Sequence, residues 1–376
     1  MTVIDVIARV ASDWADPEFP SRKEAVHQTL HADNTFTAEA TAFALNRCMS
    51  LMSKESLQEL SETVRPEGLA EVPDLASGQR PLVVVRHGAA TPVEGIREAV
   101  AAMLMGVRVR SMLTPSSPAI IPAFYKDLKE QGPDIDVACL GSVEELPRDG
   151  RGKQDASDST VLCVSAEEAG SSSSAAKDDL KAWCSAEEGV WIKRQHGYAV
   201  GIIDGSEPDD VRHDLAEDAL LHEGRAAETL RVLWAPDDLT PDPMLQAMAD
   251  FRGVFPAHED TPGSLEMRRA FLEAADQSHA YAAGMQFLVS RGAPEPQDGS
   301  HLRWSEYEDL ADVAEWITEH AHEVDMLVVR PQLAKRLPES LQPESLQRLG
   351  IEPVAPGRVH RKPLGTPRVR RILEHL

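Results

Sequence analysis

Short apolar runs that alternate with helical patterns constrain this sequence more than any other feature. From Pro81 the run PLVVV leads into a glycine-containing turn, a helical pattern over about 92–105 and a second β-rich run at 107–113. Further β-rich runs follow at 135–141, 160–165 and 196–204. Strands that alternate with helices at this spacing are typical of βαβ units in a parallel sheet. We therefore predict an α/β fold.

Changes in the pattern divide the chain into four parts. We expect a helical N-terminal segment at 1–75, two α/β domains at 76–205 and 206–356, and a basic C-terminal segment at 357–376. Within the third part, the periodicity predicts a buried strand at 230–236, a long helix over 263–284 and a strand at 325–330.

Charge and apolar content exclude several classes of protein. The 38 basic residues stand against 62 acidic ones, so the net charge of −24 argues against nucleic-acid binding, which needs a surplus of cations. The longest apolar stretch, near 99–105, is too short for a membrane span, and no basic region precedes the apolar N-terminal residues. The four cysteines form no CxxC pair, so no metal centre is expected. We expect a cytoplasmic protein.

Four segments carry a resemblance to a known family. They are PLVVVRHGAATPVEG at 81–95 with the helix and strand that follow it to residue 118, IKRQHGYAVGIID at 192–204, ALLHEGRAAETLRVLWAP at 219–236 and GRVHRKPLGTP at 357–367. In this order they resemble the aldehyde dehydrogenase superfamily, and most of all the fatty acyl-CoA reductases of bacterial bioluminescence. The resemblance implies two Rossmann-like domains, a cofactor-binding-like domain at 76–205 and a catalytic-like domain at 206–356. It also implies NADPH-dependent reduction of an acyl-CoA to an aldehyde through an acyl-cysteine intermediate.

The positions that resemble the family's functional side chains are substituted. The nucleophilic cysteine falls on Ala227, and the turn asparagine that helps to hold the oxyanion falls on Ala90. A methyl group cannot act as a nucleophile, so an impaired reductase is expected. The lysine that reaches the ribose or phosphate of the cofactor falls on Met112. Arg108 and Arg110, on the same strand, are the cations best able to replace that lysine.

The resemblance also implies where ligands bind. A cofactor site is expected near 87–91 and 113–116, and a substrate tunnel would meet it at 224–229. The residues of the cofactor site would be Gly88, Thr91, Met112, Thr114 and Ser116.

Other candidate catalytic groups have simpler structural interpretations. Cys48, Cys139, Cys163 and Cys184 are most simply core residues, with Cys184 the least certain of them to be so. His196 and His222 could border the cleft, although structural or surface histidines are the commoner case. Glu223 and Glu228 flank Ala227 and could form an acid/base pair. In a chain with 62 carboxylates, however, such a pair near any loop is expected by chance.

Three functions remain open at the level of sequence. One is an impaired acyl-CoA reductase that uses NADPH. A second is a non-catalytic binding or assembly protein with the same fold, and a third is an unrelated α/β enzyme. The segment 357–376 adds an expectation about assembly, because it holds a single acid, Glu374, and six cations. We expect this segment to dock on an acidic surface of its own chain or of a neighbouring subunit, in a protein that is at least a dimer. The six cations are Arg358, Arg361, Lys362, Arg368, Arg370 and Arg371.

Overall fold

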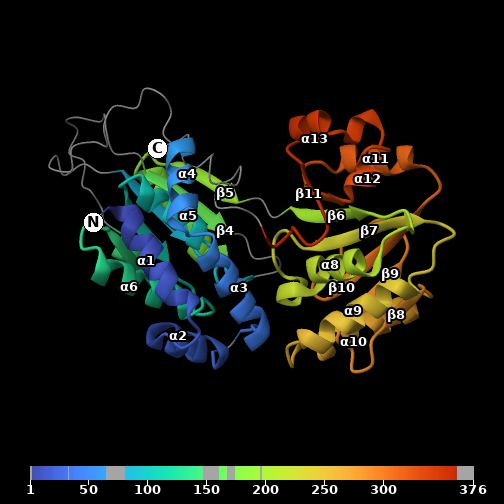
Figure 1. Ribbon diagram of the computed structural model, residues 1–376, viewed down its shortest axis with the longest axis horizontal. Coiled ribbons are helices and arrows are strands. Elements are labelled where there is room, and N and C mark those ends of the chain that lie inside the picture. The colour runs from blue at the N-terminus through green and yellow to red at the C-terminus, as the bar shows by residue number, and fades with distance from the viewer. Residues whose placement is uncertain are drawn as a thin grey trace. The chain divides into compact units, whose positions relative to one another are not determined.

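The computed structural model describes residues 2–32, 34–64, 81–146, 161–166, 174–194 and 197–361. The described chain forms two compact units (Figure 1). The first contains everything up to the strand that ends at Arg194, apart from residues 35–40. The second contains those six residues together with the chain from the next strand to residue 361.

Helices make up the described part of the N-terminal segment. They are α1 (Val3–Ala15), α2 (Pro20–Leu30), α3 (Ala38–Ser50) and α4 (Lys54–Val64). A capping box between Thr2 and Asp5 begins α1, whose apolar stripe is fully buried. Trp14 at the end of that stripe donates its indole N–H to Asp127 at 2.7 Å and packs edge-on against Phe124. The N-terminal helices therefore share the core of the first unit.

The first unit is built around a five-stranded parallel sheet in the order β3-β2-β1-β4-β5 (Figure 1). Its strands are β1 (Leu82–Arg86), β2 (Arg108–Met112), β3 (Val137–Leu140), β4 (Val161–Ala166) and β5 (Val190–Arg194). The connecting helices are α5 (Ile96–Leu104), α6 (Ile120–Gln131) and α7 (Ser174–Ala186), with a short turn of helix at Val143–Glu145. The predicted α/β class is confirmed.

The apolar run of β1 reflects burial on both faces of the sheet. Val83 and Val85 join the core formed with α1, α5 and α6, while Leu82 and Val84 join a second cluster with Leu180 and other side chains of α7. Because β1 is the central strand, the turn that follows it lies at the middle of the sheet's carboxyl edge.

The second unit contains a seven-stranded sheet in the order β12-β11-β6-β7-β10-β9-β8. Its strands are β6 (Tyr198–Ile202), β7 (Leu230–Pro236), β8 (His279–Tyr281), β9 (Leu288–Arg291), β10 (His301–Tyr307), β11 (Val324–Val329) and β12 (Glu352–Val354). Only β8 runs antiparallel to its neighbour among these described strands. The helices are α8 (Asp209–Leu220), α9 (Asp242–Val254), α10 (Thr261–Ala274), α11 (Leu310–Glu319), α12 (Pro331–Ala334) and α13 (Pro343–Leu349), with short turns of helix at Leu221–Gly224 and Glu339–Leu341.

The change from one sheet to the other differs from the boundary expected near residue 205. Strand β6 pairs with β7 and β11 of the second sheet, so the change falls between Arg194 and Tyr198. Two consecutive apolar strands with only three residues between them gave no sequence signal for a change of sheet.

The long helix predicted over 263–284 is wrong in its second half. Helix α10 ends at Ala274, and Asp276 has a positive φ of 53°, a conformation that an α-helix cannot continue through. The chain then forms β8, and β9 and β10 follow, strands that the sequence analysis did not anticipate.

Candidate functional site

Ligands of open α/β sheets bind outside the carboxyl ends of the strands, where neighbouring connections leave in opposite directions. In the first sheet this point lies beside β1, which has β2 on one side and β4 on the other. In the second sheet it lies beside β6, between β7 and β11. The turns that follow β1 and β6 are therefore the first places to look for a site.

The turn after β1 folds around His87, which is fully buried. Its Nδ1 donates to the backbone carbonyl of Glu94 at 2.6 Å. Gly95 begins α5 with a φ of 83°, and a Cβ at that position would collide with the His87 ring. The sequence HGAATPVEG thus forms a compact loop that closes on itself.

A carboxylate of the protein occupies the inside of this turn. Glu94 is 6% exposed, and its Oε2 accepts the backbone N–H of Ala90 at 3.1 Å. A Cβ on Gly88 would lie 2.6 Å from the same oxygen, so glycine makes room for the carboxylate. The Thr91 carbonyl accepts the backbone N–H of Glu94 at 3.3 Å. An N–H that could hold an external anion therefore already holds an internal one.

A cavity of about 140 Å³ lies at the carboxyl ends of β1, β2 and β3, beside α7. Of the residues expected to bind a cofactor, Met112 and Thr114 line it, whereas Gly88, Thr91 and Ser116 do not. Ser116 instead lies 3.1 Å from the Thr114 hydroxyl, within hydrogen-bond distance, and so supports a residue of the lining.

Arg86 supplies a cation to this cavity. It ends β1 directly opposite Met112 in the strand register, is 6% exposed and lines the cavity. Arg110 is occupied elsewhere, because it forms an ion pair with Asp136 at 2.7 Å and does not line the cavity. Arg86 was not among the residues expected to bind a cofactor. The sequence feature that could have indicated it is a single arginine at the end of an otherwise apolar strand.

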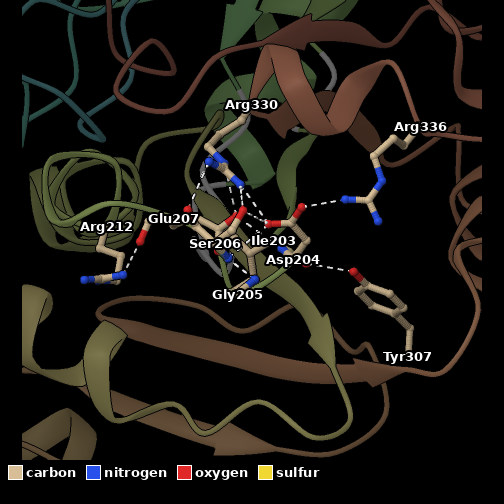
Figure 2. Close-up of polar contacts among 9 residues, drawn as sticks. All are labelled: Ile203, Asp204, Gly205, Ser206, Glu207, Arg212, Tyr307, Arg330 and Arg336. Carbon is tan, nitrogen blue, oxygen red and sulfur yellow. Dashed lines mark hydrogen bonds and ion pairs between the residues drawn. The ribbon is translucent and has the colours of Figure 1, made fainter.

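The turn after β6 is held by a network of ion pairs and hydrogen bonds (Figure 2). The Glu207 carboxylate accepts the backbone N–H groups of Asp204 and Gly205 at 3.1 and 2.9 Å. Arg330, which follows β11, contacts Glu207 at 3.2 Å and Asp204 at 2.7 Å. Here too, a glutamate of the chain occupies the strand-end turn.

Burial and charge act in opposite directions on Asp204. Burial alone would raise the pKa of its carboxyl, but hydrogen bonds from Ser206 and the charges of Arg330 and Arg336 lower the pKa overall. Figure 2 shows Arg336 reaching the second carboxylate oxygen, and Tyr307 donating to the carbonyl of Ile203 at 2.8 Å. The network is consistent with a structural role.

The loop that resembles the family's nucleophile segment has an unusual backbone. His222, Glu223 and Gly224 have consecutive positive φ values of 55°, 57° and 64°. Two of the three are not glycine, so the conformation is strained. Gly224 is required because a Cβ there would collide with the carbonyl of Gly299.

A buried network holds this loop through Glu223. Its carboxylate accepts from Arg252 at 3.0 Å, Thr261 at 2.6 Å and Ser300 at 3.3 Å. The ion pair with Arg252 is almost fully buried, with side-chain exposures of 5% and 4%. Since Glu223 is committed to these contacts, its expected alternative role in an acid/base pair with Glu228 has no support from this geometry.

The small side chains that follow the strained residues of this loop are buried. Ala226 and Ala227 are 1% and 5% exposed, and Thr229 is 1% exposed. Burial, with a smaller contribution from His360, lowers the pKa of His222 to about 3, so this histidine is neutral. His196 lies outside the described residues.

The cysteines whose side chains are described do not have the character of nucleophiles. Burial raises the pKa of Cys48 and of Cys139 to about 11, which suppresses the thiolate form. Cys184 is 1% exposed and packs in the cluster with Met112. Cys163 lies on β4, and its side chain is outside the described ones.

The described part of the chain contains no group of three or more His, Cys, Asp or Glu side chains arranged to hold a metal ion. None of its helices is both long and apolar enough to cross a membrane.

Comparisons with known proteins identify the fold. No model of a protein family matches the sequence, and no curated protein matches it. Solved structures do match. A NAD-dependent benzaldehyde dehydrogenase from Corynebacterium glutamicum is similar over 100% of this chain and 84% of its own, with a TM-score of 0.63 and 12% identity.

Two further structures give the same result. Aldehyde dehydrogenase 21 from Physcomitrella patens, in complex with succinate, matches 97% of this chain and 79% of its own at a TM-score of 0.62 and 11% identity. Succinic semialdehyde dehydrogenase from Streptococcus pyogenes, in complex with NADP+, matches 94% of this chain and 81% of its own, with a TM-score of 0.58 and 12% identity. At these identities the likeness shows the fold alone. The chain has the α/β fold of the aldehyde dehydrogenases.

Proposed function

We propose that this chain is a relative of the acyl-CoA reductases. It no longer reduces thioesters, and it acts by binding an acyl-CoA without converting it. The observation that carries the proposal is the pair of buried alanines, Ala226 and Ala227, in the loop after Gly224. Acyl transfer from CoA in this fold would need a thiolate there, and a methyl group offers no electron pair to the thioester carbon.

The turn after β1 supports the same proposal. An oxyanion needs hydrogen-bond donors that point at it before it forms. Ala90 has no side-chain donor, and its backbone N–H is held by Glu94 at 3.1 Å. The negative charge of that carboxylate would also repel an oxyanion. Two catalytic requirements, a nucleophile and an oxyanion donor, are thus unmet by the residues that resemble the family's positions.

A nicotinamide dinucleotide, by resemblance NADPH, is the cofactor to be tested against the cavity in the first unit. When bound, such a cofactor supplies a hydride. Arg86 would pair with a phosphate, and the Thr114 hydroxyl would hydrogen-bond a ribose. Glu144 and Asp179 also line the cavity, and their negative charges would oppose a phosphate. Ligand pockets commonly measure roughly 300–1,000 Å³, so 140 Å³ fits one sugar or phosphate rather than a whole dinucleotide. The residues fit part of the cofactor, and weak binding is expected.

An assembly role through the C-terminal segment is the second candidate, and the described start of that segment shows how it meets acidic residues. Asp218, on α8, accepts the backbone N–H groups of Gly357 and Val359 at 2.8 and 3.3 Å. Arg361 forms two hydrogen bonds with Glu217 at 2.9 and 2.7 Å. The basic segment thus begins by docking on acidic residues of its own chain. Residues 362–376 lie outside the described ones, and a homo-oligomer built through them remains a proposal.

Turnover and binding should be measured separately on the purified protein. We expect no acyl-CoA-dependent oxidation of NADPH above a control without protein, together with calorimetric binding of a long-chain acyl-CoA. Oxidation of NADPH that requires acyl-CoA and is abolished by thiol alkylation would overturn the loss of catalysis. Absence of any acyl-CoA binding would leave assembly as the better proposal.

A cysteine variant tests the location of the lost nucleophile. With acyl-CoA, Ala227→Cys should form an acyl-thioester on the new sulfur with release of CoA as its thiol, detected as a mass increase of the intact protein. The matched control is Ala226→Cys, which adds the same thiol one residue earlier. Equal labelling of both variants would show that position 227 has no special geometry.

A further inference from the structure

Two arginines of the second unit contact one aspartate, and a third arginine lies near them. Arg231, near the start of β7, forms an ion pair with the Asp298 carboxylate. Arg268, on α10, donates to the backbone carbonyl of the same residue. Arg231 is largely buried, with 13% of its side chain exposed, whereas 56% of the Asp298 side chain is exposed. The two guanidinium groups therefore contact the same residue, whose side chain is exposed to solvent.

Arg225 belongs to the same group through the strained loop. It directly follows Gly224, which packs against Gly299, the residue after Asp298. Arg225 is exposed, and no ion pair of its side chain occurs within the described part of the chain. Burial lowers the pKa of the Arg268 guanidinium, and the nearby Arg225 and Arg231 lower it further, against the opposing effect of Asp298. Arg225 and Arg231 thus both lie close enough to Arg268 for their charges to act on it.

The charge of this group is unbalanced. In its described contacts this group sets three cations against one carboxylate, a surplus of two positive charges, in a chain whose net charge is −24. Each guanidinium also carries more N–H donors than these contacts use, and the buried Nε of Arg231 has no hydrogen-bond partner in the described structure. Guanidinium groups bind phosphate oxygens in pairs, and a phosphate dianion would neutralise the surplus.

We infer that Arg225, Arg231 and Arg268 form a binding site for a phosphate group of a small-molecule ligand, beside the loop that carries Ala227. A single carboxylate would neutralise only half of the surplus charge, so a phosphate or pyrophosphate group is the better match. The site lies within the second unit and shares no residue with the cavity of the first. It also does not depend on the proposed function, because a simple phosphate carries neither an acyl chain nor a nicotinamide.

Inorganic pyrophosphate is the probe for this site. Calorimetric titration at low ionic strength should show saturable binding to the wild-type protein that weakens as salt is added. Arg225→Gln should weaken it by roughly tenfold to a hundredfold, the usual effect of losing one charge-assisted hydrogen bond. Because Arg225 is exposed, this variant should keep the wild-type melting temperature without ligand.

The matched control is Arg348→Gln, which removes the same charge from α13 of the same unit. Arg348 contacts only its own helix among the described residues, through Glu344 and Ser345. The Arg348→Gln variant should bind pyrophosphate as the wild type does. Pyrophosphate should raise the melting temperature of this variant and of the wild type. The proposal is overturned if the wild type does not bind pyrophosphate, if Arg225→Gln binds equally well, or if Arg348→Gln loses as much affinity.

Discussion

The turns after β1 and β6 stand at equivalent points of two sheets, and each encloses a glutamate of its own chain. Glu94 takes one backbone N–H in the first, whereas Glu207 takes two in the second and also contacts Arg330. The second turn is thus a closed ionic network. In the first turn the described partner of the carboxylate is the Ala90 N–H, and the cavity lined by Arg86 contains no residue of 87–95. The comparison teaches that in both units a carboxylate of the chain itself takes the backbone N–H groups of the strand-end turn.

This comparison also explains why neither turn looks like a phosphate loop. Dinucleotide-binding folds leave the N–H groups of such turns open for a phosphate. Here a phosphate would have to displace a carboxylate, at the expense of its hydrogen bonds. The places proposed for ligand phosphates are therefore arginines: Arg86 in the first unit, and Arg225, Arg231 and Arg268 in the second.

The largest expected effect comes from breaking the network after β6. Arg330→Met leaves Glu207 without its cation and Asp204 with Arg336 alone, and removal of one partner from a largely buried ion pair costs up to about 3–5 kcal/mol. Arg336→Met is the matched control, because Arg336 contacts the same Asp204 at 2.9 Å with 65% of its side chain exposed. Its loss should cost about 0–1 kcal/mol. Denaturant unfolding measures both values, and equal losses would show that the network does not depend on burial.

Acid should weaken the second unit through His222. The folded-state pKa of about 3 lies below the ordinary 6.5, so the unfolded chain takes up the proton first. The stability due to the neutral ring is present above about pH 6.5 and is lost as the pH falls toward the folded-state pKa. The slope is about 1.4 kcal/mol per pH unit, or about 2–3 kcal/mol between pH 6 and pH 4.

His222→Asn removes this titration and suits the backbone, because asparagine tolerates a positive φ better than most residues. Unfolding free energies at pH 6 and pH 4 should differ less in the variant than in the wild type. His213→Asn is the control. Hydrogen bonds to the Asp209 carbonyl and Asp250 raise the pKa of His213, so its contribution changes only above this window. An unchanged slope in His222→Asn would contradict the buried neutral state.

The sequence predicted the α/β class and the parallel strands around β1, because burial on both faces produces apolar runs such as PLVVV. It did not predict β10, whose inward-facing positions include His301, Arg303 and Ser305. The described hydrogen bonds of these side chains reach β9 and the residue after it, for instance the Ser290 hydroxyl at 2.7 Å from Nε2 of His301. A strand whose polar residues are satisfied by distant residues gives no hydrophobic pattern to read.

The candidate site was only partly accessible from sequence for the same reason. Met112 and Thr114 follow from resemblance and do line the cavity, but Arg86 does so because of strand register. Glu223 stood out only as a neighbour of Ala227. Its ion pair with Arg252 joins residues 29 positions apart, and no local spacing indicates it.

Emptying the turn after β1 tests the other side of the comparison. Glu94→Ala leaves the Ala90 N–H without its acceptor and should cost about 1–2 kcal/mol. Added phosphate should restore part of that loss, since the emptied turn becomes an anion site that only the folded state offers. Glu94→Gln keeps an acceptor oxygen and should neither lose as much stability nor respond to phosphate. Thermal melting with and without phosphate checks both, and an unresponsive Glu94→Ala would mean that the turn collapses.

The smallest effect is expected where the chain docks on α8 after β12. Arg361 holds Glu217 through two hydrogen bonds, with 34% and 12% of the side chains exposed. Partial exposure screens this pair, so Arg361→Gln should cost about 0.5–1 kcal/mol at low salt and less at high salt, where the screening length falls from about 10 Å at 0.1 M to about 3 Å at 1 M.

Arg358→Gln removes an exposed cation three residues earlier that forms no ion pair within the described structure, and it should leave stability nearly unchanged. Unfolding at two salt concentrations separates the outcomes. If the two variants lose equal stability with equal salt dependence, the segment is held by its general positive charge and by the backbone contacts to Asp218 rather than by the Arg361–Glu217 pair.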